Sequence, residues 1–370
     1  MRRLRWTRSS RCWRDLPNLL LVVGAASLIL LACLSSIPDY SKSRNLVAHR
    51  SPPTKSRSPP TFSSSPPTFS ISPLSVSSLV RHPSRPLTTA ETSDCLRRRG
   101  AALGRSTRIT FIGNSRARQV FETLAGQRRL RLLTRAQTAG RTPFLDEPLL
   151  PDWHHFADPN STCVGVWPKG RPKGEPARAW CSQLAVGDGL ELEFRWRNAM
   201  FRFLDVLRRL ERGCARGLPC PDFIVINQGL HFVVNGRFGR LMPIFREYLE
   251  DCVPYLRRLT ARRVKVLWML EHAGNPRIGP ESYNDDLTVL NALLADLFTR
   301  RLRLPGLHVW TSEASAVARF WSRECFWRLP ELSPEDRHVC MQERYHVNNG
   351  TLEVMAQQLI NFVCDSDDYN

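Results

Sequence analysis

The chain has 370 residues, 42% of them hydrophobic, and carries a formal net charge of +19 from 53 Lys and Arg against 34 Asp and Glu. This length suits one large domain with accessory segments. Before about Ser93 the sequence is basic, continuously apolar or rich in Pro and Ser, which excludes a packed core there, so only the remaining part can fold into a globular domain.

The N-terminal quarter predicts a membrane anchor and a spacer. Residues 1–15 form an Arg-rich tail, and residues 16–37 are apolar and long enough to cross about 30 Å of hydrocarbon. The arginines favour a cytosolic N-terminus and a type II signal anchor, with a cleaved signal peptide as the alternative. Residues 38–93 repeat Ser-Pro-Pro-Thr and predict an extended, O-glycosylated stalk. The main domain, 94–366, ends in a short tail, 367–370, and is expected to be lumenal or extracellular.

Cysteines and sequons fit an oxidising compartment. An odd number of cysteines lies beyond the apolar segment, which predicts several disulfides and one free or intermolecular thiol. These are Cys95, Cys163, Cys181, Cys214, Cys220, Cys252, Cys325, Cys340 and Cys364. No Cys-x-x-Cys or Cys/His spacing suggests a metal site, so none is expected. Asn160 and Asn349 begin glycosylation sequons. A translocated basic domain is expected to meet anionic glycans or lipids rather than nucleic acid.

Short apolar runs alternate with helical patterns in the main domain. Four buried strands are expected at 108–113, 222–227, 263–270 and 307–310, and helices at 116–126, 237–260, 283–301 and 351–364. This alternation predicts a doubly wound, mainly parallel α/β sheet. The segment 146–183, rich in Pro, Trp and Gly, is expected to be a loop insertion that Cys163 and Cys181 could staple.

Ligands of an open parallel sheet bind beyond the carboxyl ends of its strands, and several polar groups follow these strands. Ser115 follows the first strand and opens a helix, as a nucleophile or as an ordinary helix cap. His346 lies three residues after Glu343, so the acid can fix the tautomer of a base aimed at the serine. A surface acid–histidine pair is the alternative.

An acyl-transfer site also needs donors for a developing oxyanion. The N–H groups of Ser115 and Gly229, together with an amide from Asn227 or Gln228, are candidates. A plain turn at 227–229 is the competing interpretation.

Several blocks carry a resemblance to a known family. Residues 111–121, with Gly113-Asn114-Ser115 followed by Arg-x-Arg-Gln, are similar to the serine block of the lumenal domain of Golgi sialate O-acetyltransferases. Further blocks resemble that domain in the same order, and they are 192–196, 225–232, 266–270, 283–285 and 343–346, with Cys95 and Cys364 bracketing the whole. The related PC-esterase branch of the SGNH hydrolases shares this skeleton.

The resemblance implies an SGNH-hydrolase-like, flavodoxin-like three-layer fold in the Golgi lumen. It implies Ser115 as nucleophile, His346 as base and Glu343 as orienting acid, with acetyl-CoA as donor and sialic acid as acceptor. No bound cofactor is expected. Arg116 and Arg118 match family positions and are expected, with Asn114, to bind an anionic donor or glycan.

The sequence departs from the family pattern at Asn114 and Glu343, where the family has Asp, and in having no multi-span membrane domain. The leading hypothesis is therefore a serine-dependent O-acyl transferase or esterase acting on glycans. A catalytically inactive glycan-binding module and a secreted lipase-like hydrolase are the alternatives. The residues do not separate transfer to a sugar from transfer to water.

Overall fold

The computed structural model describes residues 86–138, 153–155, 166–168, 182–197, 200–234, 238–278 and 281–365. All of these lie within one compact unit, Ile71–Asn370. The expected anchor, most of the expected stalk, Asn160 and the Cys163 and Cys181 pair lie outside the described residues. Among the helices of the described ranges, none has the length and apolar character to cross a bilayer.

A seven-stranded sheet runs through the centre of the unit in the order β2-β5-β6-β1-β7-β8-β9. Neighbouring strands from β6 to β9 are parallel, and β2 and β5 add an antiparallel edge. The expectation of a mainly parallel α/β sheet is confirmed. The strands are β1 (Thr107–Gly113), β2 (Arg131–Leu132), β5 (Gln183–Gly187), β6 (Leu190–Trp196), β7 (Phe223–Asn227), β8 (Lys265–Met269) and β9 (Leu307–Trp310).

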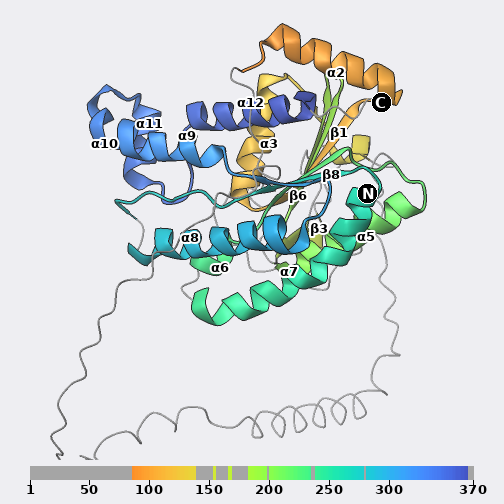
Figure 1. The fold of residues 1–370 in the computed structure, drawn as a ribbon. Helices are drawn as coiled ribbons and strands as arrows, with labels where there is room; N and C mark the ends of the chain where they lie inside the picture. The colour runs from red at the N-terminus through yellow and green to blue at the C-terminus, as the bar shows by residue number, and fades with distance from the viewer. Residues whose placement is uncertain are drawn as a thin grey trace, which may run out of the picture. The chain divides into compact units, whose positions relative to one another are not determined.

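Helices cover both faces of this sheet, on opposite sides in Figure 1. One layer holds α2 (Thr89–Leu103), α3 (Ser115–Gln127), α9 (Glu313–Arg319) and α12 (Asn349–Asp365). The other holds α5 (Met200–Ala215), α6 (Leu230–Val234), α7 (Phe238–Ala261) and α8 (Glu281–Ala295). The inner strands are apolar on both faces because each face is covered.

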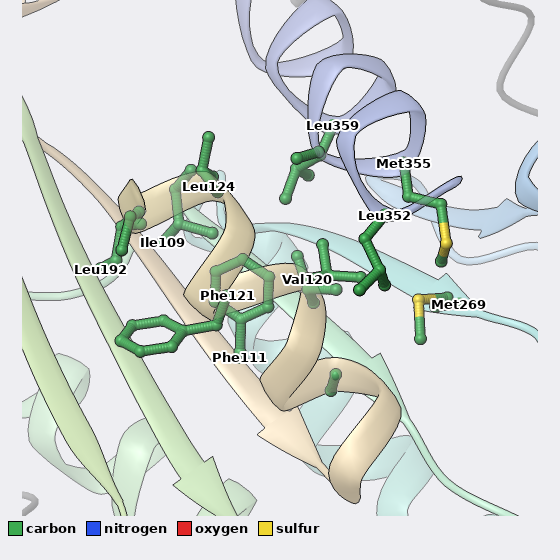
Figure 2. Close-up of a cluster of buried hydrophobic side chains, with 14 of the residues drawn as sticks. Ile109, Phe111, Val120, Phe121, Leu124, Leu192, Met269, Leu352, Met355 and Leu359 are labelled. Atoms are coloured by element: carbon green, nitrogen blue, oxygen red, sulfur yellow. The ribbon is translucent and has the colours of Figure 1, made fainter. Parts of the chain in front are cut away.

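The first of the two cores joins elements from both ends of the domain. Phe111 of β1, Phe121 of α3 and Leu359 of α12 are fully buried in it, and Figure 2 shows them as members of one cluster of apolar side chains. The rings of Phe111 and Phe121 pack edge to face, with centroids 5.8 Å apart. This packing holds α3 and α12 in place, and the N-termini of both helices lie close in sequence to the site residues described below.

Helix α2 was not predicted, and it begins within the segment that the sequence assigned to the stalk. Thr88 caps it, since its side chain accepts from the Glu91 N–H while the Glu91 carboxylate accepts from the Thr88 N–H. Residues 89–93, expected in the stalk, are therefore helical. A disulfide between Cys95 and Cys364 ties α2 to the end of α12.

Two further disulfides lie within the described residues, Cys214–Cys220 and Cys325–Cys340, so the expectation of several is confirmed. Cys252 is the free cysteine in this part of the chain, and burial raises the pKa of its thiol. A buried neutral thiol is a core residue rather than a nucleophile.

The structure adds elements that periodicity did not suggest. The helix expected at 283–301 is α8 continued by a π-helix at Asp296–Leu302, and α5 and β5 were not anticipated. The remaining elements are β3 (Trp153–His155), β4 (Val166–Pro168), α4 (Arg135–Thr138), the π-helix η5 (Phe320–Glu324), α10 (Cys325–Trp327), η6 (Leu329–Glu331) and α11 (Pro334–Gln342).

Candidate active site

Ser115 and His346 meet at the carboxyl end of the sheet, although 231 residues separate them in the chain. Ser115 opens α3 directly after β1, and His346 lies in the loop before α12. The Ser115 Oγ is 2.9 Å from His346 Nε2, and His346 Nδ1 is 3.2 Å from a Glu343 carboxylate oxygen. The structure thus brings together the three residues expected to form a catalytic triad.

Hydrogen-bond chemistry fixes how this histidine is protonated. An ionised carboxylate only accepts, so the proton of the neutral imidazole lies on Nδ1, facing Glu343. Nε2 then presents its lone pair to the Ser115 hydroxyl, as a general base requires. The hydrogen bond from His346 lowers the pKa of Glu343, which keeps this half-buried carboxyl ionised. The longer Glu343 side chain therefore orients the imidazole as an Asp would.

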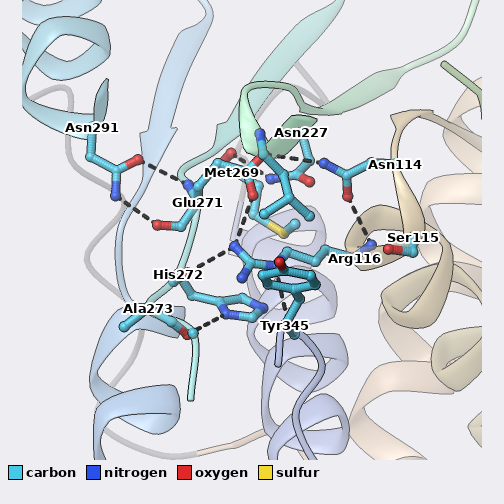
Figure 3. Close-up of polar contacts among 12 residues, drawn as sticks. Asn114, Ser115, Arg116, Asn227, Met269, Glu271, His272, Ala273, Asn291 and Tyr345 are labelled. Atoms are coloured by element: carbon cyan, nitrogen blue, oxygen red, sulfur yellow. Dashed lines mark hydrogen bonds and ion pairs between the residues drawn. The ribbon is translucent and has the colours of Figure 1, made fainter. Parts of the chain in front are cut away.

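Asn114 is a structural residue rather than a substrate ligand. Its side chain is buried, its Oδ1 accepts from the Arg116 N–H at 2.9 Å, and its Nδ2 donates to Glu271 at 3.1 Å. It caps α3 and holds the turn that presents Ser115 (Figure 3). The expectation that Asn114 binds substrate is corrected, because both ends of its amide are already engaged.

Arg116 is likewise withdrawn from the surface. Its side chain is fully buried and its Nη1 lies 2.9 Å from the Glu271 carboxylate, with Glu271 equally buried. The guanidinium also donates to three oxygens, which are the His272 carbonyl, the Tyr345 carbonyl and the Tyr283 hydroxyl. The expectation that Arg116 binds an anionic substrate is corrected, because its donors are used inside the protein (Figure 3).

Glu271 is the acceptor at the centre of this buried network. Besides Arg116 and Asn114, its carboxylate accepts from the Leu230 N–H at 2.9 Å, and its backbone N–H and C=O both bond the amide of Asn291. It therefore links the ends of β1, β7 and β8 to α8. Glu271 directly follows the expected strand 263–270, and it was not predicted as a site residue because a carboxylate after a strand has no distinctive spacing.

The buried pair also joins the two halves of the triad. Arg116 follows Ser115, and its Nε donates to the carbonyl of Tyr345, the residue before His346, at 3.1 Å. One guanidinium thus connects the backbone beside the nucleophile to the backbone beside the base.

The four expected oxyanion donors differ in the hydrogen bonds that they already make. The Asn227 amide donates to the Met269 carbonyl at 3.2 Å, and the Gln228 amide donates to the Arg197 carbonyl at 2.6 Å. Each of these amides uses one of its two N–H groups in the bond to a carbonyl, and the role of Asn227 or Gln228 in an oxyanion hole stays a prediction. Within the described residues, the backbone N–H groups of Ser115 and Gly229 have no hydrogen-bond partner.

Gly229 is required by its backbone and by its neighbours. Its φ of +139° lies in a region that disfavours side chains, and an added Cβ would come within 2.4 Å of a Leu290 methyl carbon. A side chain here would displace the turn that carries the Gly229 N–H.

Two further histidines lie close to the network. His272 Nδ1 is 3.1 Å from the Ala273 carbonyl, so Nδ1 carries its proton, and burial and then Arg116 hold its pKa well below the usual value. Burial also lowers the pKa of His231, whose Nε2 has no partner within the described residues. Both rings are therefore neutral at neutral pH.

Arg118 remains a candidate for contact with substrate. It lies on α3 one turn from Ser115, is partly exposed, and stacks 6.0 Å from the centroid of the Trp196 ring. Asn349 of the second sequon is exposed at the start of α12. No group of three metal-ligating side chains occurs among the residues that the structure describes.

Comparisons with known proteins give distant structural likenesses. No protein-family model and no curated protein matches the chain. A lipase from a goat rumen metagenome is 11% identical, with a TM-score of 0.33, over 72% of this chain and 100% of the lipase. A catalytic mutant of an acetylxylan esterase from Geobacillus stearothermophilus is 13% identical, with a TM-score of 0.29, over 69% of this chain and 93% of the esterase.

Proposed function

We propose that this protein is a serine-dependent acyl-ester enzyme in which Ser115, His346 and Glu343 form the catalytic triad. The observation that carries the proposal is the 2.9 Å contact between Ser115 Oγ and His346 Nε2, with Glu343 on the other ring nitrogen. If Ser115 were only a helix cap, no histidine would be needed beside its hydroxyl. If Glu343 and His346 were only a surface pair, no serine would be needed beside the imidazole. The three groups together favour nucleophilic catalysis over either alternative.

The proposed reaction has two steps. The Ser115 oxygen attacks the carbonyl carbon of an acyl donor while His346 Nε2 accepts the hydroxyl proton, and Glu343 stabilises the imidazolium. The carbonyl oxygen becomes negative and is held by two backbone N–H groups. That of Ser115 lies at the start of α3, where the helix dipole favours negative charge, and that of Gly229 follows β7. The intermediate then collapses to an acyl-serine, and His346 returns the proton to the leaving group.

The second step restores the serine. An acceptor hydroxyl gives its proton to His346 and attacks the acyl carbon, and His346 then protonates the Ser115 oxygen as the new ester departs. A sugar hydroxyl as acceptor makes the protein a transferase, and water makes it an esterase. From the sequence resemblance we propose a glycan such as sialic acid as acceptor, acetyl-CoA as donor, and Arg118 as a contact for the anionic partner.

We also propose a type II topology in the Golgi membrane, with residues 16–37 as the anchor and the catalytic unit lumenal. Support comes from the Arg-rich tail ahead of the apolar segment and from the disulfides of the described part. The inactive glycan-binding alternative drew on the Asn at position 114. The cap and the bond to Glu271 give that residue a structural role compatible with catalysis.

A fluorophosphonate probe that forms a covalent adduct with activated serines tests the assignment. The wild-type chain should be labelled, Ser115→Ala and His346→Ala should not, and Ser315→Ala should be labelled like wild type because Ser315 lies exposed on α9. Equal labelling of wild type and Ser115→Ala would reject the nucleophile.

A partition experiment separates the two activities. The acyl-enzyme formed from an acyl donor is divided between water and added sialic acid, and the products are separated. A transferase gives O-acylated sugar at the expense of free acid, whereas an esterase gives free acid at every sugar concentration.

A further inference from the structure

An apolar groove lies beside the candidate active site. It has a volume of about 380 Å³, within the usual size of small-molecule sites. Trp321 and Gly274 are buried in its lining, and Ala318 and Pro276 are exposed at its walls. Phe326 and Trp327 complete it and are 58% and 76% exposed, which is unusual for such large apolar side chains.

The groove is formed by segments that also touch the triad loop. One wall is the loop after β8, where Asn275 donates to the Glu343 carbonyl at 3.1 Å. The other is the helical run α9–η5–α10, held to α11 by the disulfide Cys325–Cys340. Figure 1 shows α9, α10 and α11 together at one end of the fold. The groove is thus connected to the loop that carries Glu343 and His346.

Three of the polar side chains that line the groove already have partners inside the protein. Trp321 Nε1 donates to the Ala273 carbonyl at 3.1 Å, and the Ser322 hydroxyl donates to the Ala318 carbonyl at 2.7 Å. Asn284 Oδ1 accepts from the Gly274 N–H at 2.9 Å. A sugar in the groove would leave hydroxyls without partners, at a cost for each one buried. An aliphatic chain has no such requirement.

The rim of the groove is positively charged. Arg319 and Arg323 directly follow the lining residues Ala318 and Ser322 along the helical run. On the opposite wall the Arg277 guanidinium lies 4.9 Å from the centroid of the Phe326 ring. All three arginines are exposed, and within the described residues none forms an ion pair. Their charge is complementary to an anion.

We propose that this groove binds a single-chain anionic lipid, with the aliphatic chain against Trp321, Phe326 and Trp327 and the head group on the rim arginines. The apolar lining selects the chain, and the charge of Arg277, Arg319 and Arg323 selects the anionic head. A cavity of this size can hold one aliphatic chain that has left the bilayer. Contact with a flat bilayer surface would need protruding side chains but no cavity. The proposal goes beyond the ester chemistry and does not depend on Ser115.

A photoactivatable fatty acid with a diazirine on its chain tests the site, with the full chain in nanodiscs of neutral phospholipid. Irradiation should label the peptide that contains Trp321 and Trp327, as read by mass spectrometry. Unlabelled alkanoates should compete, with about a three- to fourfold gain for each added methylene until the groove is full. Ser115→Ala should be labelled like wild type, so loss of catalysis and loss of binding are distinguishable.

Two variants and their matched controls locate the ligand. Ala318→Trp fills the groove and should reduce labelling about tenfold or more, whereas Ala314→Trp, exposed one turn earlier on α9, should not. Arg319→Glu with Arg323→Glu should abolish the preference for the fatty acid over the corresponding uncharged alcohol. Arg257→Glu, exposed on α7 in the other helix layer, is the charge control.

Three results would overturn the proposal. These are equal labelling of Ala318→Trp and Ala314→Trp, equal labelling of wild type by the acid and the alcohol, and binding to anionic vesicles without labelling of the groove peptide. The last result would assign the exposed aromatics to a bilayer surface instead.

Discussion

Substitution of Glu271 by Gln tests whether the buried pair holds the triad together. The change keeps the side-chain shape but removes the negative charge opposite Arg116, and both side chains are fully buried. Both oxygens of the Glu271 carboxylate accept hydrogen bonds, which come from Arg116, Asn114 and the Leu230 N–H. The change replaces one of these oxygens by an NH₂ group. At least one buried donor then faces another donor.

The expected cost follows from the burial. Removal of one partner of a buried ion pair destabilises by about 3–5 kcal/mol, because the other charge stays buried without compensation. That is a large part of the usual 5–15 kcal/mol for a folded domain. A shift of the Arg116–Tyr345 contact would also move the loop of His346, and a displacement of about 1 Å costs on the order of 10²-fold in rate.

Urea unfolding and steady-state ester hydrolysis measure the two effects. Glu271→Gln should lower the free energy of unfolding by about 3–5 kcal/mol and lower kcat while KM changes little, because both side chains are fully buried. Glu250→Gln breaks the exposed Arg246–Glu250 pair on α7 and should cost below about 1 kcal/mol. Equal losses in both variants, or a rise in KM with unchanged kcat, would refute the structural role of the pair.

Three further predictions concern the orienting acid, a buried carboxyl and a disulfide. Glu343→Ala should lower kcat/KM of ester hydrolysis by on the order of 10²–10⁴-fold, because His346 loses the group that fixes its tautomer. Glu313 is fully buried with neither oxygen bonded within the described residues, and burial raises its pKa well above the usual value. Its contribution to stability is therefore present below pH 4.5 and is lost as pH rises toward its folded pKa, so Glu313→Gln should be stabilising at pH 7.5 and near neutral at pH 4, by urea unfolding. Loss of the disulfide between Cys95 and Cys364, by double Ser substitution, should lower the free energy of unfolding by about 2–5 kcal/mol.

Each of these has a control and a contradicting result. Glu335→Ala, exposed at the start of α11, should leave hydrolysis unchanged, and equal activity of Glu343→Ala and wild type would remove the acid from the mechanism. A Glu313→Gln effect that does not vary with pH would contradict a buried neutral acid. The Cys214–Cys220 disulfide closes a much shorter loop, so its loss should cost less, and the reverse order would contradict the chain-entropy argument.

Local sequence was sufficient for the main strands, and it singled out Ser115, Glu343 and His346, which the fold brings together. β1, β7, β8 and β9 were expected within a few residues, because apolar runs buried on both faces are unambiguous when turn residues bound them. It failed for α2, whose cap at Thr88 lies inside a stretch that composition assigned to the stalk.

The tertiary structure decided which polar residues face the site and which are buried behind it. The sequence predicted that Ser115, Asn114 and Arg116, which are neighbours at one strand end, would all face the site. A helix turns about 100° per residue, so adjacent side chains point in different directions, and only packing shows which direction meets solvent. Here the hydroxyl of Ser115 meets His346, while Arg116 points inward to Glu271, because the carboxyl end of β8 brings the Glu271 carboxylate beneath the start of α3.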